Sequence, residues 1–248
     1  MSWKFGLIGK NLDHSFSPQY FAKKFRSLQL PHTYETLALN ELDSAREQIV
    51  QLGWNGFNVT IPYKEEIIPY LDGLTPEATS IHAVNCVVIQ NNQWLGHNTD
   101  MGGFEKSILP FLENKYPRAL IIGTGGAAKA ISLVLQRKGI EVFFLTREPK
   151  AQNHLSRHSI DAQSMIHFPL IINCTPLGTW PNTETYPDIP YDGLTPQHYL
   201  FDLVYNPEET VFLKKGIEMG CQAQNGLRML EIQADLSWIF WSDALKNY

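Results

Sequence analysis

The sequence contains little cysteine. Cys86, Cys174 and Cys221 lie far apart in the 248 residues and form no C-x-x-C pair. Zinc sites and redox dithiols use such pairs, and disulfide frameworks use more cysteines in shorter chains. The histidines show no H-E-x-x-H spacing either, so no metal site is expected. Free thiols fit a reducing compartment, and the predicted location is cytoplasmic.

Long apolar runs, charge blocks and repeats are also missing. No apolar stretch approaches the ~18 residues of a membrane span, and the first residues show no signal-peptide pattern, so no contact with a membrane is expected. A net charge of −5 provides no general attraction for nucleic acid. A small anionic ligand would need local positive charge or backbone N–H groups. The composition, 44% hydrophobic and 18% charged, indicates a globular chain, and its length predicts one or two domains.

Short apolar runs alternate with amphipathic stretches, which predicts a largely parallel α/β arrangement. The expected strands are 5–9, 34–39, 56–60, 83–90, 118–122, 141–146, 169–174 and 199–204. The expected helices are 17–28, 40–52, 103–112, 126–138, 150–157 and 227–245. Ser17 before Pro18 is the predicted N-cap of the first helix, and Asn40 that of the second. A turn is expected at Asn91 and Asn92, and a loop from Pro176 to Pro196.

A glycine-rich turn lies between an apolar strand and a helix. Its residues are Gly123, Thr124, Gly125, Gly126, Ala127 and Ala128, which fit G-x-G-x-x-A. In this motif the first glycine permits a tight turn, the second lets a pyrophosphate approach the backbone, and the final small residue lets the helix pack closely on the strand. The first N–H groups of the helix then face the phosphates. The context on both sides favours a dinucleotide site over a turn without a ligand, and therefore an oxidoreductase.

About 20 residues further on, the chain reaches the position of a ribose-reading residue. Thr146, Arg147, Glu148 and Lys150 lie there. The two basic residues favour the 2′-phosphate of NADP, whereas Glu148 suits the 2′-hydroxyl of NAD. A solvated loop with a local ion pair is the other interpretation.

Further motifs occur in a fixed order along nearly the whole chain. They are Ser15-Phe16-Ser17-Pro18, Asn58-Val59-Thr60-Ile61-Pro62-Tyr63-Lys64, Ala83-Val84-Asn85, Asn98-Thr99-Asp100, the turn above, Asn173-Cys174-Thr175-Pro176-Leu177-Gly178, Asp202-Leu203-Val204-Tyr205, and Gly226-Leu227-Arg228-Met229-Leu230-Glu231-Ile232-Gln233. Each motif alone is weak, but the ordered series resembles the shikimate dehydrogenase family.

The resemblance implies the NADPH-dependent reduction of 3-dehydroshikimate to shikimate, on the route to aromatic amino acids. It implies two α/β domains with the active site in a cleft between them: a substrate domain, 1–100 with 226–248, and a Rossmann-like cofactor domain, 101–225. The final helix returns to the first domain. The expected ligands are therefore this substrate and NADP, with NAD possible, in a monomer or homodimer.

The resemblance also implies a set of substrate contacts. Ser15 and Ser17 would hold the substrate carboxylate, since two hydroxyl donors can orient it without a counter-ion; helix capping is the alternative for Ser17. Other positions that match the family's substrate pocket are Thr60, Asn85, Tyr205 and Gln233. Such polar groups suit a polyhydroxylated ring, because a site built to bind each hydroxyl penalises analogues that lack one.

Lys64 and Asp100 match the family's catalytic pair. Reduction of a ketone places negative charge on its oxygen, so a cation that also donates a proton stabilises the transition state. The hypothesis is that Lys64 is the acid–base group and that Asp100 orients it and the substrate. A surface ion pair is the structural alternative.

The remaining matches concern the cofactor. Leu203 and Gly226 correspond to positions near the nicotinamide, and Thr175 lies in a loop that either contacts the cofactor or only ends a strand. His82 stands where the family usually has glycine and is expected to be a loop or packing residue. Two rival functions stay open: an NAD-using quinate/shikimate dehydrogenase, and a non-catalytic dinucleotide sensor.

Overall fold

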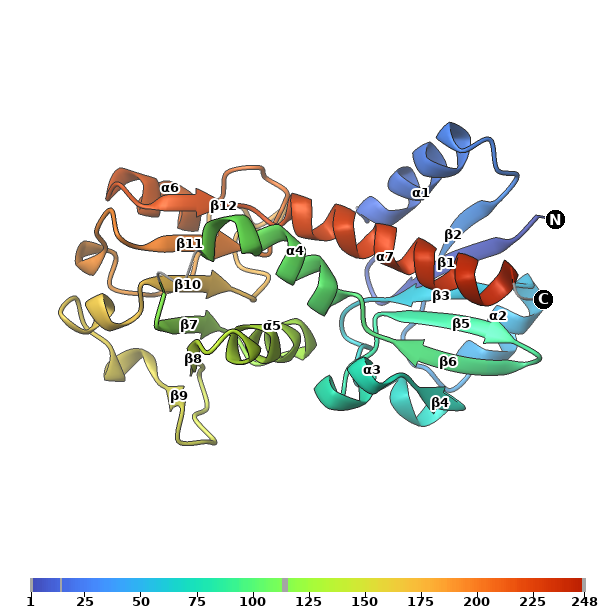
Figure 1. The fold of residues 1–248 in the computed structure, drawn as a ribbon, viewed down its shortest axis with the longest axis horizontal. Helices are drawn as coiled ribbons and strands as arrows, with labels where there is room; N and C mark the ends of the chain where they lie inside the picture. Colours follow the sequence, from blue (N-terminus) through green and yellow to red (C-terminus); the bar gives the residue numbers. More distant parts are fainter. Residues whose placement is uncertain (1, 14, 113–115, 247–248) are drawn as a thin grey trace. The chain divides into compact units, whose positions relative to one another are not determined.

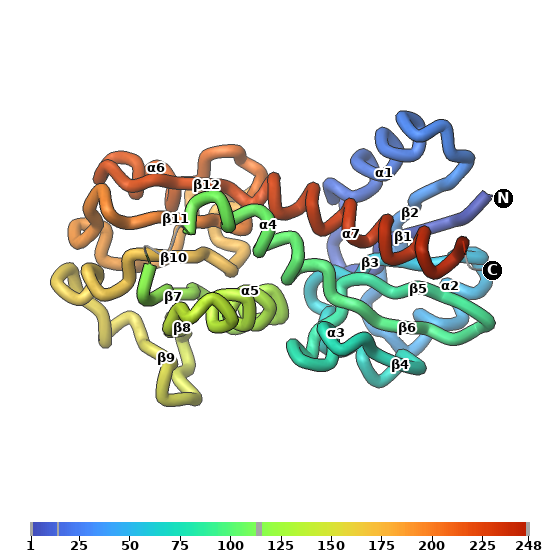
Figure 2. The backbone as a smooth tube through the Cα atoms, viewed as in Figure 1, coloured from blue at the N-terminus to red at the C-terminus, as the bar shows by residue number. Residues whose placement is uncertain are grey.

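The computed structural model of this chain describes residues 2–13, 15–112 and 116–246. They form two compact units: unit 1 is Met1–Gly102 with Glu231–Tyr248, and unit 2 is Gly103–Leu230. The chain enters unit 2 within helix α4 (Asp100–Leu112) and returns within α7 (Leu227–Lys246), a path that can be followed along the tube in Figure 2. The sequence-based limits at 100 and 226 place these crossings at the starts of the same two helices.

Unit 1 contains a six-stranded sheet in the order β2-β1-β3-β5-β6-β4 (Figure 1). Its strands are β1 (Lys4–Gly9), β2 (Thr33–Ala38), β3 (Gly56–Val59), β4 (Gly73–Leu74), β5 (Cys86–Gln90) and β6 (Gln93–His97). The expectation of a largely parallel layer is wrong at its centre, where β5 is antiparallel to both β3 and β6. For the β5–β6 pair the physical reason is the two-residue turn at Asn91 and Asn92, whose left-handed φ angles of 49° and 65° suit a tight hairpin.

Alternate side chains of this sheet enter two separate cores. Cys86 and Val88 of β5 join the core that contains Trp241 of α7, whereas Val87 between them joins the core that contains Ile49 of the helix α2. This alternation follows from the two-residue period of a strand. The other helices of unit 1 are α1 (Phe16–Ser27), α2 (Ala45–Leu52), α3 (Pro76–Ile81) and the 3₁₀ turn η1 (Ile68–Tyr70). Both faces of the sheet are therefore covered.

Two predicted helix starts are wrong. Helix α1 begins at Phe16, so Ser15 occupies the N-cap position and Ser17 lies inside the first turn with a buried side chain. Proline is tolerated in a first turn, which is why Pro18 does not mark the boundary. Helix α2 begins at Ala45 after Ser44 rather than at Asn40. The intervening segment forms bends and a turn, and its Leu42 is buried in the core.

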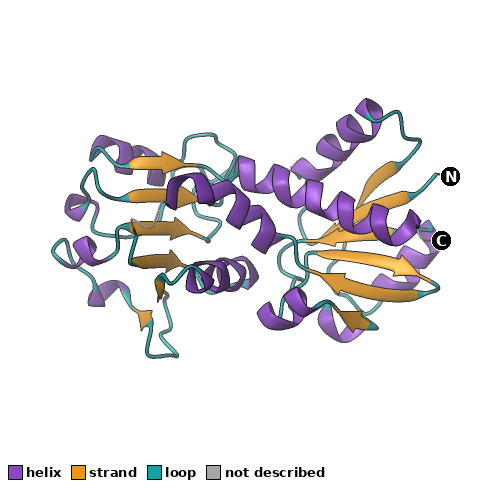
Figure 3. Ribbon diagram, in the orientation of Figure 1, coloured by secondary structure: helices purple, strands orange, loops and turns teal. Residues whose placement is uncertain are grey.

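Unit 2 contains a second sheet, whose strands are the orange arrows of this unit in Figure 3. Every pairing is parallel, and the order is β12-β11-β10-β7-β8-β9 (labels in Figure 1). Its strands are β7 (Arg118–Ile122), β8 (Glu141–Leu145), β9 (His154–Leu155), β10 (Leu170–Asn173), β11 (Tyr199–Asp202) and β12 (Gln222–Gln224). Numbered from β7, this is the 3-2-1-4-5-6 order of the Rossmann fold. The predicted fold class, α/β with a Rossmann-like parallel sheet, is confirmed.

The helix predicted at 150–157 is wrong. The segment instead forms a turn and then β9, which pairs with the edge of β8 through Phe144 and Leu145. Edge pairing satisfies backbone groups that a short amphipathic helix would have satisfied internally. The helices of unit 2 are α5 (Gly126–Arg137) and α6 (Val211–Glu218), with the 3₁₀ turns η2 (Arg157–Ser159), η3 (Ser164–His167) and η4 (Tyr191–Gly193). Within the described residues, no helix is both long enough and apolar enough to cross a membrane.

Candidate active site

In unit 1 an ion pair joins Lys64 and Asp100. The Lys64 Nζ lies 2.7 Å from Asp100 Oδ2, and the side chains are 18% and 6% exposed. The carboxylate is therefore almost enclosed, whereas the ammonium group retains access to the surface. This exposure distinguishes the pair from an ordinary solvated surface pair, which would hold neither side chain firmly.

The local fold determines where both charges lie. Asp100 is the first residue of α4, and the Asn98 side chain accepts hydrogen bonds from the N–H groups of Asp100 at 3.0 Å and Met101 at 3.3 Å. A carboxylate at a helix N-terminus is also stabilised by the helix dipole. Lys64 follows β3, and its carbonyl accepts a 2.7 Å hydrogen bond from Val84 N–H. The sequence reasoning quoted Asn98 in a motif but assigned it no role; its position two residues before an acidic helix start was the signal.

Asn85 connects the ion pair to α7. Its Nδ2 donates to Asp100 Oδ1 at 2.8 Å and approaches Gln233 Oε1 at 3.3 Å. Its Oδ1 accepts from Thr99 N–H at 2.8 Å. The structure therefore brings together four of the predicted site residues, Lys64, Asp100, Asn85 and Gln233, which lie up to 169 positions apart in the sequence.

A second chain of polar contacts runs from Ser17 towards the same place. The buried Ser17 hydroxyl hydrogen-bonds to Tyr34, whose own hydroxyl donates to Asn58 Oδ1 at 2.9 Å. Asn58 Nδ2 in turn donates to Ser237 Oγ at 2.9 Å. Burial raises the pKa of Tyr34 well above its usual value, so the phenol stays a proton donor. Sequence reasoning missed Tyr34 and Ser237, because a strand tyrosine and a helix serine carry no motif.

The other three predicted substrate residues lie next to the ends of helices and strands. Ser15 occupies the N-cap position of α1 without capping the helix through its side chain. Thr60 follows β3, where a Cβ on Gly9 would lie 2.5 Å from its methyl group. Tyr205 belongs to unit 2, shortly after β11. Their substrate roles stay predictions.

The glycine-rich turn of unit 2 has the geometry of a dinucleotide site. Gly123 follows β7 with a φ of +102°, and Gly125 is the N-cap of α5. A Cβ built on Gly125 would meet nothing within 4 Å, so open space lies against this backbone where a pyrophosphate would bind. Ala128 is fully buried, which allows α5 to pack closely. These residues fit the cofactor that their pattern predicts.

At the ribose end, charged side chains surround the turn after β8. Lys150 Nζ lies 3.1 Å from Glu148 Oε2, with both side chains more than three-quarters exposed (76% and 78%). The N–H of Glu148 donates to Thr146 Oγ1 at 3.3 Å. Arg147, between Thr146 and Glu148 in the sequence, is also exposed. An exposed pair of this kind is weak, so a phosphate could compete with Glu148 for Lys150.

The residues predicted near the nicotinamide lie at the carboxyl edge of the same sheet. A Cβ on Gly123 would lie 3.2 Å from Thr175 Cγ2, so the loop after β10 contacts the turn. A Cβ on Gly226 would lie only 2.2 Å from the Leu203 carbonyl oxygen, so no side chain fits there. Glycine at position 226 is therefore required by the close approach of two backbones.

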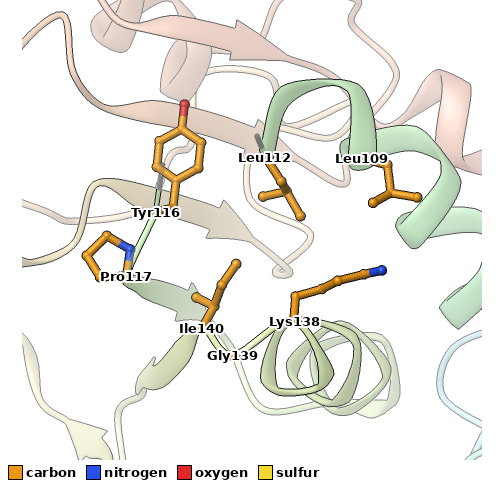
Figure 4. A pocket seen from close by; sticks show the side chains of 7 residues that line it. All are labelled: Leu109, Leu112, Tyr116, Pro117, Lys138, Gly139 and Ile140. Carbon is orange, nitrogen blue, oxygen red and sulfur yellow. The ribbon is translucent and has the colours of Figure 1, made fainter. Parts of the chain in front are cut away.

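A pocket of about 520 Å³ in unit 2 lies elsewhere (Figure 4). Its lining residues are Leu109, Leu112, Tyr116, Pro117, Lys138, Gly139 and Ile140. Pro117 precedes β7, whereas Gly123 follows it, so the five-residue strand separates pocket and turn by roughly 16 Å. The pocket is not the dinucleotide site. Among the described residues, no cluster of three or more His, Cys, Asp or Glu side chains could hold a metal ion.

A Rossmann sheet with a glycine-rich turn, together with a partly buried lysine–aspartate pair in a second α/β unit, defines a dinucleotide-dependent protein with two units. Residues 7–87 match the family model described as the shikimate dehydrogenase substrate binding domain. The shikimate dehydrogenase (NADP(+)) of Desulforamulus reducens is 34% identical to this chain, over 96% of it and 89% of the relative. That of Shouchella clausii is 37% identical, over 100% and 95%.

Solved structures agree. The shikimate 5-dehydrogenase of Thermus thermophilus in complex with NADP(H) and shikimate superposes with a TM-score of 0.85 at 29% identity, covering 97% of this chain and 93% of that one. The chain belongs to the shikimate dehydrogenase family.

Proposed function

We propose that this chain catalyses the reversible NADPH-dependent reduction of 3-dehydroshikimate to shikimate. The observation that carries the proposal is the Lys64–Asp100 ion pair, which Asn85 links to Gln233 in unit 1. The Lys64 ammonium group is accessible, and the Asp100 carboxylate is fixed by its hydrogen bond from Asn85. Membership of the family, the NADP-dependent relatives and the glycine-rich turn support the same reaction.

Lys64 supplies the proton in this scheme. As the carbonyl carbon accepts hydride, its oxygen becomes an alkoxide, and the ammonium group next to it stabilises the charge and then donates a proton. Asp100 orients Lys64 through the 2.7 Å contact. In the reverse direction the neutral lysine accepts the proton of the hydroxyl group.

The substrate contacts follow from the two polar networks. Asn85 and Gln233 present amide groups beside the ion pair, where they would bind ring hydroxyls. Ser15 and Ser17 would bind the carboxylate, Ser17 by exchanging its bond with Tyr34 for one to the substrate. Thr60 and Tyr205 complete the proposed set. In this proposal unit 1 is the substrate domain and unit 2 the cofactor domain.

NADPH, when bound, supplies the hydride. Gly123, Thr124, Gly125, Gly126 and Ala127 would bind its pyrophosphate at the N-terminus of α5. The ribose-end contacts would come from Thr146, Arg147 and Lys150, and the nicotinamide-end contacts from Thr175, Leu203 and Gly226. Arg147 and Lys150 would bind the 2′-phosphate, with Lys150 leaving its exposed partner Glu148.

The direct test is the loss of NADPH absorbance when 3-dehydroshikimate is added to the purified protein. Lys64→Ala should abolish most of the turnover, whereas Lys23→Ala, which removes an exposed lysine of α1, should not. Binding of NADPH without any turnover would support the sensor function instead. Near-normal turnover by Lys64→Ala would show that Lys64 is not the acid–base group.

One observation favours a second candidate, a dehydrogenase that uses NAD and accepts quinate. Glu148 lies beside Lys150 at the ribose end, and a carboxylate there suits a 2′-hydroxyl group. Steady-state rates with NADP and NAD, on shikimate and on quinate, distinguish the two. Our proposal requires a preference for NADP and for shikimate, and Glu148→Gln should strengthen the preference for NADP.

A further inference from the structure

Two neighbouring strands of unit 2 end in a pair of completely buried polar residues. Strands β10 and β11 are neighbours in the sheet (Figure 1). Asn173 ends β10 and Asp202 ends β11, and the two are direct partners in the parallel register. Asn173 Nδ2 donates to Asp202 Oδ1 at 2.9 Å. The Leu203 N–H also donates to the Asn173 carbonyl oxygen at 3.0 Å. Side chains and backbone therefore join the strand ends at the point where both loops begin.

Each member of the pair also holds the loop that follows its own strand. Asp202 Oδ1 accepts from the Val204 N–H at 3.0 Å, which fixes the turn around Leu203. Asn173 Oδ1 accepts from both the N–H and the hydroxyl group of Thr175, at 3.0 and 2.6 Å. The Asn173–Asp202 pair thus orients Thr175 and Leu203, two residues proposed to contact the cofactor.

A third contact reaches Asp202 from another side. Thr210 Oγ1, at the N-cap of α6, donates to Asp202 Oδ2 at 2.6 Å. The groups that hydrogen-bond to this carboxylate, an amide, a backbone N–H and a hydroxyl, are all neutral. Burial therefore raises the pKa of Asp202 to about 6. The ionised carboxylate therefore destabilises the folded state at neutral pH. Buried groups with a perturbed pKa of this kind are more common at functional sites than elsewhere.

We propose that Asp202 is a positioning residue for the nicotinamide end of the cofactor site, acting through Asn173 on Thr175 and through Val204 on Leu203. The proposal rests on the proposed function, because it assumes that these loops contact NADPH. It requires a hydrogen-bond acceptor at Asp202 Oδ1, where both loops are tied, and not the negative charge itself.

Three variants separate this role from general stability. Asp202→Leu removes the acceptor and should release both loops. Asp202→Asn can keep an oxygen towards Asn173 and Val204 while its amide group donates to Thr210, so it should rescue binding. Thr210→Val removes the hydroxyl group on the α6 side alone, and is the matched control for a loss of stability without a loss of loop contacts.

The measurement compares two ligands on each folded variant. One is NADPH, and the other is 2′-phospho-ADP-ribose, which has the same adenosine and pyrophosphate but no nicotinamide. We expect Asp202→Leu to weaken NADPH binding by about tenfold or more, the scale of one well-formed contact, and to leave the fragment nearly unaffected. Asp202→Asn and Thr210→Val should bind both ligands like the wild type. For Asp202→Leu, the KM for NADPH should rise while the KM for 3-dehydroshikimate stays unchanged.

Each alternative result has a definite meaning. Equal weakening of both ligands by Asp202→Leu would show a purely structural role and overturn the proposal, as would unchanged NADPH binding. Failure of Asp202→Asn to rescue binding would overturn the requirement for an acceptor alone. If Asp202→Leu does not fold, Asn173→Leu tests the same connection from β10. Absence of NADPH binding by the wild type would overturn the proposed function and this proposal with it.

Discussion

The charge of Asp202 should make stability depend on pH in a way that Asp202→Asn removes. Burial raises the pKa of this carboxyl from the ordinary 3.8 to about 6. A group whose pKa is raised by folding stabilises the folded state when protonated, below pH 4. That stability is lost as the pH rises through 6. One factor of ten in proton affinity corresponds to about 1.4 kcal/mol, so the full loss is about 3 kcal/mol.

Urea unfolding of both proteins from pH 4.5 to 7.5 measures this effect. Other titrating groups contribute equally to the two proteins and cancel in the difference. The free energy of unfolding of Asp202→Asn minus that of the wild type should therefore increase by about 2 kcal/mol over this range, since about a third of the loss has already occurred at pH 4.5. A difference that stays constant to within about 0.5 kcal/mol would refute the reasoning, because it would mean that Asp202 is not desolvated.

Other substitutions test separate parts of the structure. Lys64→Ala should lower kcat by about 10²–10⁴-fold with little change in the NADPH dissociation constant, as measured by stopped-flow rates and fluorescence titration. His82 is exposed with a left-handed φ of 57°, so His82→Gly should raise the free energy of unfolding by about 1 kcal/mol; a destabilised variant would contradict this account. In Gly226→Ala the new Cβ would lie 2.2 Å from the Leu203 carbonyl oxygen and should force that carbonyl away. We expect a higher KM for NADPH and a destabilisation of about 1–3 kcal/mol in thermal unfolding. Gly73→Ala is its control, because that Cβ comes no closer than 3.5 Å to Leu95, and equal effects of the two substitutions would count against a specific clash.

The left-handed conformation of His82 bears on the resemblance, which implies glycine at this position. The residue follows α3 as its C-cap, with φ 57° and ψ 42°. Glycine adopts this conformation without strain, whereas a residue with a Cβ does not. The resemblance marked His82 as unusual without a cause, and the backbone conformation supplies a reason to expect glycine there.

Local patterns in the sequence determined much of this protein. The strand 118–122 is found at its predicted residues, since an apolar run followed by glycines has few alternatives. The glycine-rich turn and the order of motifs predicted the fold class and the family before any contact was known. The helix starts at Ser17 and Asn40 were wrong, because proline is tolerated within the first turn of α1 and Leu42 is buried in the segment before α2. The helix at 150–157 was wrong because edge pairing with β8 outweighed local preference.

Tertiary structure decided how these pieces become sites. Lys64, Asn85 and Gln233 have no local reason to meet; they do so because β3 pairs with β5 in the sheet of unit 1 and α7 packs against both strands. The contacts of Asp202 were equally hidden, since a strand ending in aspartate is ordinary until its register places it opposite Asn173. Propensity acts between neighbours in the chain, whereas burial and hydrogen-bond partners depend on long-range packing. The types of residue in each candidate site could therefore be predicted from the sequence, whereas their contact partners could be identified only from the fold.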